Sequence, residues 1–176
     1  MALKKREIFE ILLMEFKSEV FSIVEEIEFQ PSVFSTDHFG QHGREHFYTF
    51  FSLHNPQILE MVHFTLFMDE LRILPRYNRF SLSKPVLSLQ ELAGRDGNFR
   101  VQPFVRTEKE IGRWAQVPFL KIPLSYKVKP VRSDTVTKKR IDRTIQNLAG
   151  DIEYIEITRA EWVDEFTPFE VDPSKI

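Results

Sequence analysis

Histidine is the residue type with the most localised chemistry in this 176-residue chain. All five histidines fall in one stretch, at His38, His42, His46, His54 and His63. Imidazoles four residues apart share one face of a helix and can bind a single divalent ion there. Gly40 and Gly43 lie between the first three histidines, and each costs about 1 kcal/mol of helix propensity relative to alanine. The spacing therefore argues against a helical His-x3-His site.

A metal site built on strands is the alternative. If strands at 45–53 and 58–68 pair as a hairpin, histidines from both strands come within cross-strand reach. The ligands would be His38 or His42 with His46 and His63, and Asp69 or Glu45 would supply a carboxylate. A divalent metal held by His42, His46, His63 and Asp69 would activate water, making the chain a metal-dependent hydrolase or nuclease. We favour the simpler interpretation, in which these are ordinary loop and strand-end histidines and the protein has no cofactor.

The acidic residues give a weaker signal for catalysis. Asp69 and Glu70 follow an apolar strand, where hydrolases often hold acidic ligands, and Glu91 and Asp96 could approach them. A restriction-like nuclease would also need Glu-x-Lys or Asp-x-Lys on a second strand. The nearest sequence, Glu108-Lys109-Glu110, has the wrong order and lies at an expected helix start. We therefore interpret these carboxylates as solvated strand ends and helix caps, and we assign no catalytic residue.

Several enzyme classes are excluded by what the sequence lacks. With no cysteine, the chain has no disulfide, no thiolate zinc site, no iron–sulfur cluster and no cysteine nucleophile. It contains no Gly-x-Ser-x-Gly, no Walker loop and no Gly-x-Gly-x-x-Gly, and it has only six glycines. These absences favour a non-enzymatic protein.

Charge is more informative by segment than in total. Lys and Arg number 24 against 26 Asp and Glu, yet residues 127–143 hold seven basic and two acidic residues. Residues 151–176 hold eight acidic and two basic residues. We predict a protein that binds another macromolecule, such as an adaptor, an immunity-type inhibitor or an assembly subunit. The contact residues we expect are Arg132, Lys138, Lys139, Arg140 and Arg143. The partner is expected to be a protein or a second copy, with nucleic acid as the alternative.

One α+β domain over residues 1–176 must position these side chains. Apolar residues at helical spacing predict a long N-terminal amphipathic helix over 3–28 and a later helix over 134–149, ended by Gly150. Alternating residues predict strands at 45–53 and 58–68 around an Asn-Pro turn. The fold class is therefore a mainly antiparallel sheet covered by two helices.

The remaining elements are predicted from local signals. They are short strands at 79–82, after the Pro75 breaker, and at 99–105; a one-turn helix from Ser88 to Gly94; a helix over 107–114; strands at 117–128 and 151–158; a short helix from Thr158; and an irregular tail from about 167. No window approaches the roughly 20 apolar residues of a membrane span. Charges at Glu10, Glu15 and Lys17 interrupt the apolar run near the N-terminus, so we expect no signal peptide and a cytoplasmic location.

Phenylalanine is unusually frequent, with 17 residues. On both faces of adjacent strands it favours a thick ordinary core, because each ring buries a large apolar area. The alternative is a cavity that carries an apolar ligand. No convergent polar anchors accompany the rings, so we predict a core.

Overall fold

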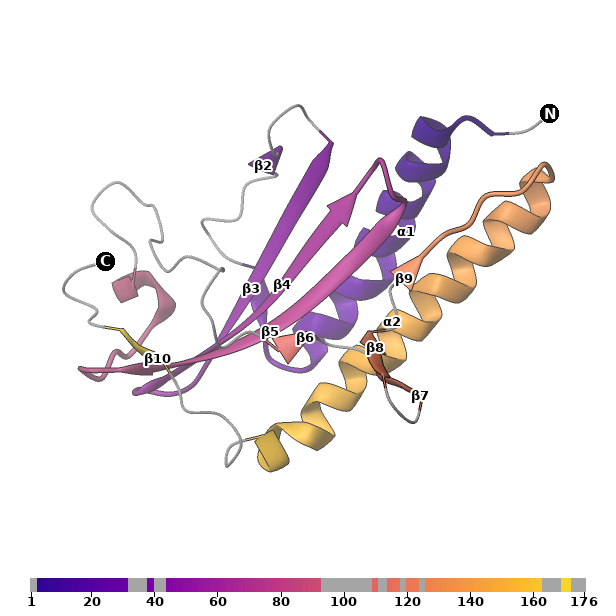
Figure 1. Ribbon diagram of the computed structural model, residues 1–176. Coiled ribbons are helices and arrows are strands. Elements are labelled where there is room, and N and C mark those ends of the chain that lie inside the picture. The colour runs from indigo at the N-terminus through magenta and orange to yellow at the C-terminus, as the bar shows by residue number, and fades with distance from the viewer. Residues whose placement is uncertain are drawn as a thin grey trace.

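The computed structural model describes residues 3–31, 38–39, 44–92, 109–110, 114–117, 120–123, 126–162 and 169–171 (Figure 1). These residues form the predicted α+β fold, with two long helices against one face of a mainly antiparallel sheet. Within the described residues the sheet has eight strands, and its main path runs β1-β3-β4-β5-β10.

Three long antiparallel strands form the centre of the sheet: β3 (Glu45–Asn55), β4 (Ile58–Phe67) and β5 (Arg72–Leu82). The two predicted strands correspond to β3 and β4 and are confirmed. Their turn is fixed locally, because the backbone N–H of Gln57 donates to the Asn55 side-chain oxygen at 2.9 Å. The register places Thr49 opposite His63, and His63 opposite Arg76. One row of the sheet therefore carries these three side chains.

Strand β5 is longer than predicted, because Pro75 does not break it. Pro75 lies opposite Phe64 of β4. On the other side of β5, strand β9 (Tyr126–Lys127) pairs with Arg72 and Ile73, and β6 (Lys109–Glu110) pairs with Arg76 and Tyr77. Among the described strands, Pro75 thus falls between two short neighbours, at a position where the missing N–H breaks no ladder bond.

Short strands line both edges of the central sheet. On the β3 side, β1 (Gln30–Pro31) pairs with Phe50 and Phe51, and β2 (His38–Phe39) pairs with His46 and Phe47. On the β5 side, β10 (Phe169–Val171) runs parallel to residues 80–82. The tail predicted to be irregular from about 167 therefore contains a strand. Strands β7 (Trp114–Val117) and β8 (Leu120–Pro123) form a separate hairpin.

Two predictions in the middle of the chain are wrong. Residues 107–114 do not form a helix where they are described, since Lys109–Glu110 is β6 and Trp114 begins β7. The single strand predicted over 117–128 is replaced by the end of β7, then β8 and β9. Pairing with β5 and within the β7–β8 hairpin overrides the local capping and alternation signals. The strand predicted at 99–105 and the helix stop at Gly94 lie outside the described residues.

Helix α1 (Lys5–Glu26) confirms the predicted N-terminal helix. Its buried stripe consists of Ile8, Phe9, Leu12, Phe16, Val20 and Val24. At its start the Lys4 N–H donates to the Glu7 carboxylate at 2.6 Å. At its end the N–H of Glu28 donates to the carbonyl of Glu25, and the N–H of Phe29 donates to that of Val24. This is a Schellman motif, which stops the helix before Pro31.

Helix α2 (Asp134–Trp162) continues well past the predicted end at 149. Gly150 does not stop it, and the strand predicted at 151–158 is wrong because these residues are helical. The short helix predicted from Thr158 is part of α2 as far as Trp162, and its remaining residues lie outside the described residues. Helix α2 continues past Gly150 because the buried stripe of Ile141, Ile145 and Leu148 continues to Ile152, which is fully buried. Packing of that stripe outweighs the cost of one glycine, about 1 kcal/mol.

The sheet has a separate apolar cluster on each face. The cluster on the helix-facing side joins α1 and α2 to β3–β5, with the ring of Phe64 lying 5.1 Å from Phe16 and 6.0 Å from Phe50. The cluster on the other side is smaller and contains Phe51, Leu59, Met61, Phe80, Leu82, Val86 and Leu92. The 3-10 helix η1 (Leu89–Leu92) covers it, at the one-turn helix predicted from Ser88. Four phenylalanines of the central strands, Phe50, Phe51, Phe64 and Phe80, are therefore core residues, as predicted.

Candidate functional site

Helix α2 holds the predicted contact residues on its outer surface. Its inner face is buried through Thr137, Ile141, Ile145, Leu148 and Ile152. Arg132 precedes the helix, and Lys138, Lys139, Arg140 and Arg143 lie on its first turns; all five are exposed. Lys139 and Arg143 are four residues apart on the face opposite the buried stripe, and Arg140 lies at the edge of that face. We call Lys139, Arg140, Arg143 and the exposed Val136 the α2 stripe.

The segment before α2 is tied to its first turns by polar contacts. The Thr137 hydroxyl, which is buried, accepts from the Val131 N–H at 3.2 Å and lies 3.0 Å from the Ser133 carbonyl oxygen. Arg140 reaches back and donates to the Lys129 carbonyl at 2.7 Å. The Leu3 N–H donates to the Asp134 carboxylate at 3.0 Å, which also joins the start of α1 to α2. These contacts hold the residues before α2, and the start of α1, against the first turns of α2 that carry the basic side chains.

The five basic residues have no carboxylate partners within the part of the chain that the structure describes. Other cations there do, such as Arg6 with Glu10 at 3.0 Å and Arg44 with Asp69 at 3.1 Å. Asp142 lies four residues after Lys138, yet the two form no ion pair. Among the described residues, no ion pair therefore neutralises the positive charge of this surface.

The neighbouring helix α1 has more acidic than basic residues, with six glutamates against Lys5, Arg6 and Lys17. Helices α1 and α2 pack against each other in one layer (Figure 1). The exposed carboxylates of α1 are Glu7, Glu10, Glu19, Glu25 and Glu26. These carboxylates lie on the helix beside the basic first turns of α2, and α2 over its whole length holds five basic and six acidic residues.

The predicted metal ligands are not brought together where they are described. His63 shares a row with Thr49, whereas His46, three residues from Thr49 on β3, lies on the opposite face. The His46 ring packs against Phe9 of α1 with ring centres 5.2 Å apart. Asp69 lies in the β4–β5 turn and pairs with Arg44. His42 and Asp96 are outside the described residues, and the side chain of His38 is not described.

His63 has a buried environment of its own. Its Nδ1 lies 2.9 Å from the Thr49 hydroxyl and its Nε2 lies 3.2 Å from the Thr65 hydroxyl. The ring stacks on Phe47 and only 1% of the residue is exposed. Burial first, and the charge of Arg76 second, lower the pKa of His63 from 6.5 to about 4. A neutral imidazole has one donor and one acceptor, which two hydroxyl groups can match.

The other acidic candidates are engaged locally. Glu70 pairs with Arg72 at 3.1 Å, and Glu91 accepts from the Leu87 N–H at 3.2 Å. In the described part of the chain, no group of three His, Asp or Glu residues is placed to hold a metal ion. Likewise, neither α1 nor any other described helix has the length and apolar character needed to cross a membrane.

A buried polar pair on the sheet is missing from the sequence-based candidates. The Tyr77 hydroxyl donates to Glu60 Oε1 at 2.8 Å, with only 1% and 2% of these residues exposed. The signal was a single carboxylate in the apolar run Ile58-Leu59-Glu60-Met61-Val62. A buried carboxylate needs hydrogen-bond donors, so this pair serves the helix-facing core.

Comparison with known proteins gives no family for the chain. No protein-family model, no curated protein and no solved structure matches it.

Proposed function

We propose that this protein binds an acidic protein partner through the α2 stripe and works as an adaptor, inhibitor or assembly subunit without catalysis of its own. The observation that carries the proposal is the set of exposed basic side chains on the first turns of one helix, none of them paired with a carboxylate among the described residues. Unpaired like charges on one face raise the rate and specificity of association with a complementary surface.

A protein partner fits this surface better than nucleic acid does. A nucleic acid is an extended polyanion that would run beyond α2, and the neighbouring helix α1 exposes five glutamates, which repel phosphates, against the two cations Lys5 and Arg6. A folded partner with an acidic patch can cover α2 alone. Val136, 43% exposed within the stripe, offers the apolar contact that protein interfaces use at their centre.

Affinity capture with matched baits tests the proposal. The charge-reversed bait carries Lys139→Glu, Arg140→Glu and Arg143→Glu, and the matched control carries Lys139→Arg, Arg140→Lys and Arg143→Lys. We expect the wild type and the control to recover the same protein from the native cells. The charge-reversed bait should recover about tenfold less, equivalent to about 1.4 kcal/mol.

Two outcomes would refute the proposal. One is equal recovery of every partner by the charge-reversed and control baits. The other is loss of all recovered material after nuclease treatment, which would identify nucleic acid as the ligand. Circular dichroism of each bait confirms that a loss of binding is not a loss of fold.

A further inference from the structure

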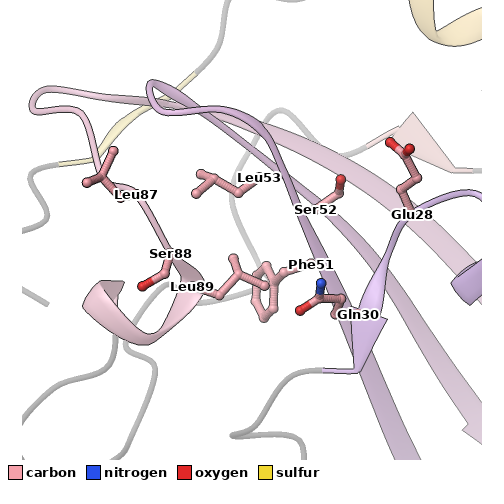
Figure 2. Close-up of a pocket in the computed structure, with 8 residues that line it drawn as sticks. All are labelled: Glu28, Gln30, Phe51, Ser52, Leu53, Leu87, Ser88 and Leu89. Atoms are coloured by element: carbon pink, nitrogen blue, oxygen red, sulfur yellow. The ribbon is translucent and has the colours of Figure 1, made fainter.

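A pocket of about 410 Å³ lies at the outer edge of β3, and no residue of α2 lines it (Figure 2). It is formed by three segments: the end of the α1–β1 turn, residues 51–53 of β3, and the chain leading into η1. Its lining residues are Glu28, Gln30, Phe51, Ser52, Leu53, Leu87, Ser88 and Leu89. The volume is in the range of pockets that bind small ligands or side chains.

The lining has two kinds of surface, separated by the plane of the sheet. Successive residues of a strand point to opposite faces, so Phe51 and Leu53 share one face and Ser52 has the other. Figure 2 shows Leu53, Leu87 and Leu89 together, with Glu28 on the far side of Ser52. A ligand lying along this edge would therefore meet leucines on one side and a hydroxyl and a carboxylate on the other.

The edge of β3 beside the pocket is open in the part of the chain that the structure describes. Strand β1 pairs with β3 only at Phe50 and Phe51. The residues just before β1 do not continue this pairing, because Glu28 and Phe29 form the Schellman motif that ends α1. Strand β3 continues to Asn55 and is paired with β4 on its other side. An open strand edge offers N–H and C=O groups to an added strand.

Two side chains at the pocket, Leu87 and Glu28, are exposed to solvent. Leu87 is 85% exposed at the rim of the pocket. Its contact with water is unfavourable, and a bound ligand would remove that contact. The Glu28 carboxylate is exposed, and no ion pair or hydrogen bond is recorded for it among the described residues. An apolar group of a ligand could cover Leu87, and a cationic group could pair with the Glu28 carboxylate.

We propose that this pocket binds an extended peptide as an added strand on β3, with an apolar side chain against Leu53, Leu87 and Leu89 and a neighbouring Lys or Arg directed to Glu28. Alternation along a strand places consecutive peptide side chains on opposite faces, which matches the two surfaces of the pocket. The recognised sequence is a basic residue next to an apolar one. This site is separate from the α2 stripe and does not depend on it.

Selection from a displayed library of random octapeptides tests this directly, because the protein itself chooses the sequence. The most enriched peptide is then synthesised and titrated against purified full-length protein. We expect enriched peptides to alternate apolar residues with Lys or Arg. Glu28→Gln and Leu87→Ser should each weaken binding of the synthesised peptide by about tenfold. N-methylation of alternate peptide amides should abolish binding, because it removes strand hydrogen bonds.

Matched variants separate the pocket from the rest of the surface. Glu25→Gln removes another exposed carboxylate of α1, and Val136→Ser removes another exposed apolar side chain, so both should bind the peptide as the wild type does. The proposal is wrong if no peptide is enriched, or if the enriched peptide binds Glu28→Gln and Leu87→Ser with unchanged affinity. It is also wrong if the variant with the charge-reversed α2 stripe no longer binds the peptide while Glu28→Gln and Leu87→Ser still bind it.

Discussion

Thr49 and His63 face each other across β3 and β4, with the threonine hydroxyl 2.9 Å from the imidazole Nδ1. Thr65 is hydrogen-bonded to the other ring nitrogen, and the three side chains occupy the sheet face opposite the helices. This contact makes His63 a neutral structural residue rather than an exposed ligand. Burial of this imidazole, together with the charge of Arg76, also makes the stability of the fold depend on pH.

Stability should fall in mild acid because of His63. Burial and Arg76 lower the pKa of His63 from 6.5 to about 4, so between these pH values the unfolded chain binds a proton that the folded chain does not. The free energy of unfolding then decreases by up to about 1.4 kcal/mol per pH unit as the pH falls from 6.5 towards 4, and this contribution is fully present above pH 6.5.

Urea unfolding of the wild type and His63→Gln across this pH range measures the effect. His63→Gln, which keeps a donor and an acceptor but does not titrate here, should lose most of the acid sensitivity. His46→Gln controls for removing a histidine from the other face of the sheet. If His63→Gln remained as acid-sensitive as the wild type, the assigned role of His63 would be wrong.

Loss of the Tyr77 hydroxyl should destabilise the helix-facing core. Tyr77→Phe removes the donor to Glu60 and leaves a buried carboxylate without that bond, at a cost of about 1–3 kcal/mol. A double-mutant cycle with Glu60→Gln isolates the interaction by denaturant unfolding. Strictly additive free energies would show that the two residues do not stabilise each other.

Replacing Gly150 with alanine should stabilise α2. Gly150 is an exposed residue inside the helix, and an added Cβ meets nothing within 4 Å. Alanine is favoured over glycine in a helix by about 1 kcal/mol, so thermal unfolding of Gly150→Ala should shift upward. The adjacent Ala149→Gly should shift it downward. A destabilised Gly150→Ala would contradict a continuous α2 at this position.

The left-handed residue after α1 should also accept glycine. Glu28 has φ 69° at the C′ position of the Schellman motif, where a non-glycine residue costs about 1–2 kcal/mol. Glu28→Gly should raise the free energy of unfolding by about 0.5–1 kcal/mol, because glycine loses part of this gain to its freer unfolded chain. Glu26→Gly, within the helix, is the control and should lower it. By removing the carboxylate, Glu28→Gly should at the same time weaken the peptide binding proposed for the pocket.

The central hairpin and α1 were predictable because local signals and tertiary packing agree there. Alternation over 45–53 and 58–68 matches two covered faces, and Asn55-Pro56 marks the turn. At Pro75 and Gly150 the local signal opposes the fold. The strands beside β5 leave room for the proline, and the buried stripe through Ile152 outweighs the glycine.

The candidate sites divide in the same way. Exposed basic residues on α2 follow from helical spacing around Ile141, Ile145 and Leu148, so the sequence locates them. The histidine positions cannot be judged until the register is known. Thr49 lies opposite His63, so these two side chains share one face of the sheet. His46 is three residues from Thr49 on the same strand, and residues an odd number apart point to opposite faces. The pocket at β3 joins segments near residues 28, 52 and 88, which no local pattern connects.

Site-specific photo-crosslinking tests the central claim, that the α2 stripe is the partner-binding surface, most directly. A photoreactive phenylalanine derivative replaces Val136, 43% exposed in the stripe, or Met14, 60% exposed on α1, so neither change disturbs the core. In native cells we predict a protein adduct at Val136, no adduct at Met14, and loss of the Val136 adduct when Lys139, Arg140 and Arg143 are changed to glutamate. An adduct at Met14 with none at Val136, or a Val136 adduct that survives the charge reversal, would contradict the claim.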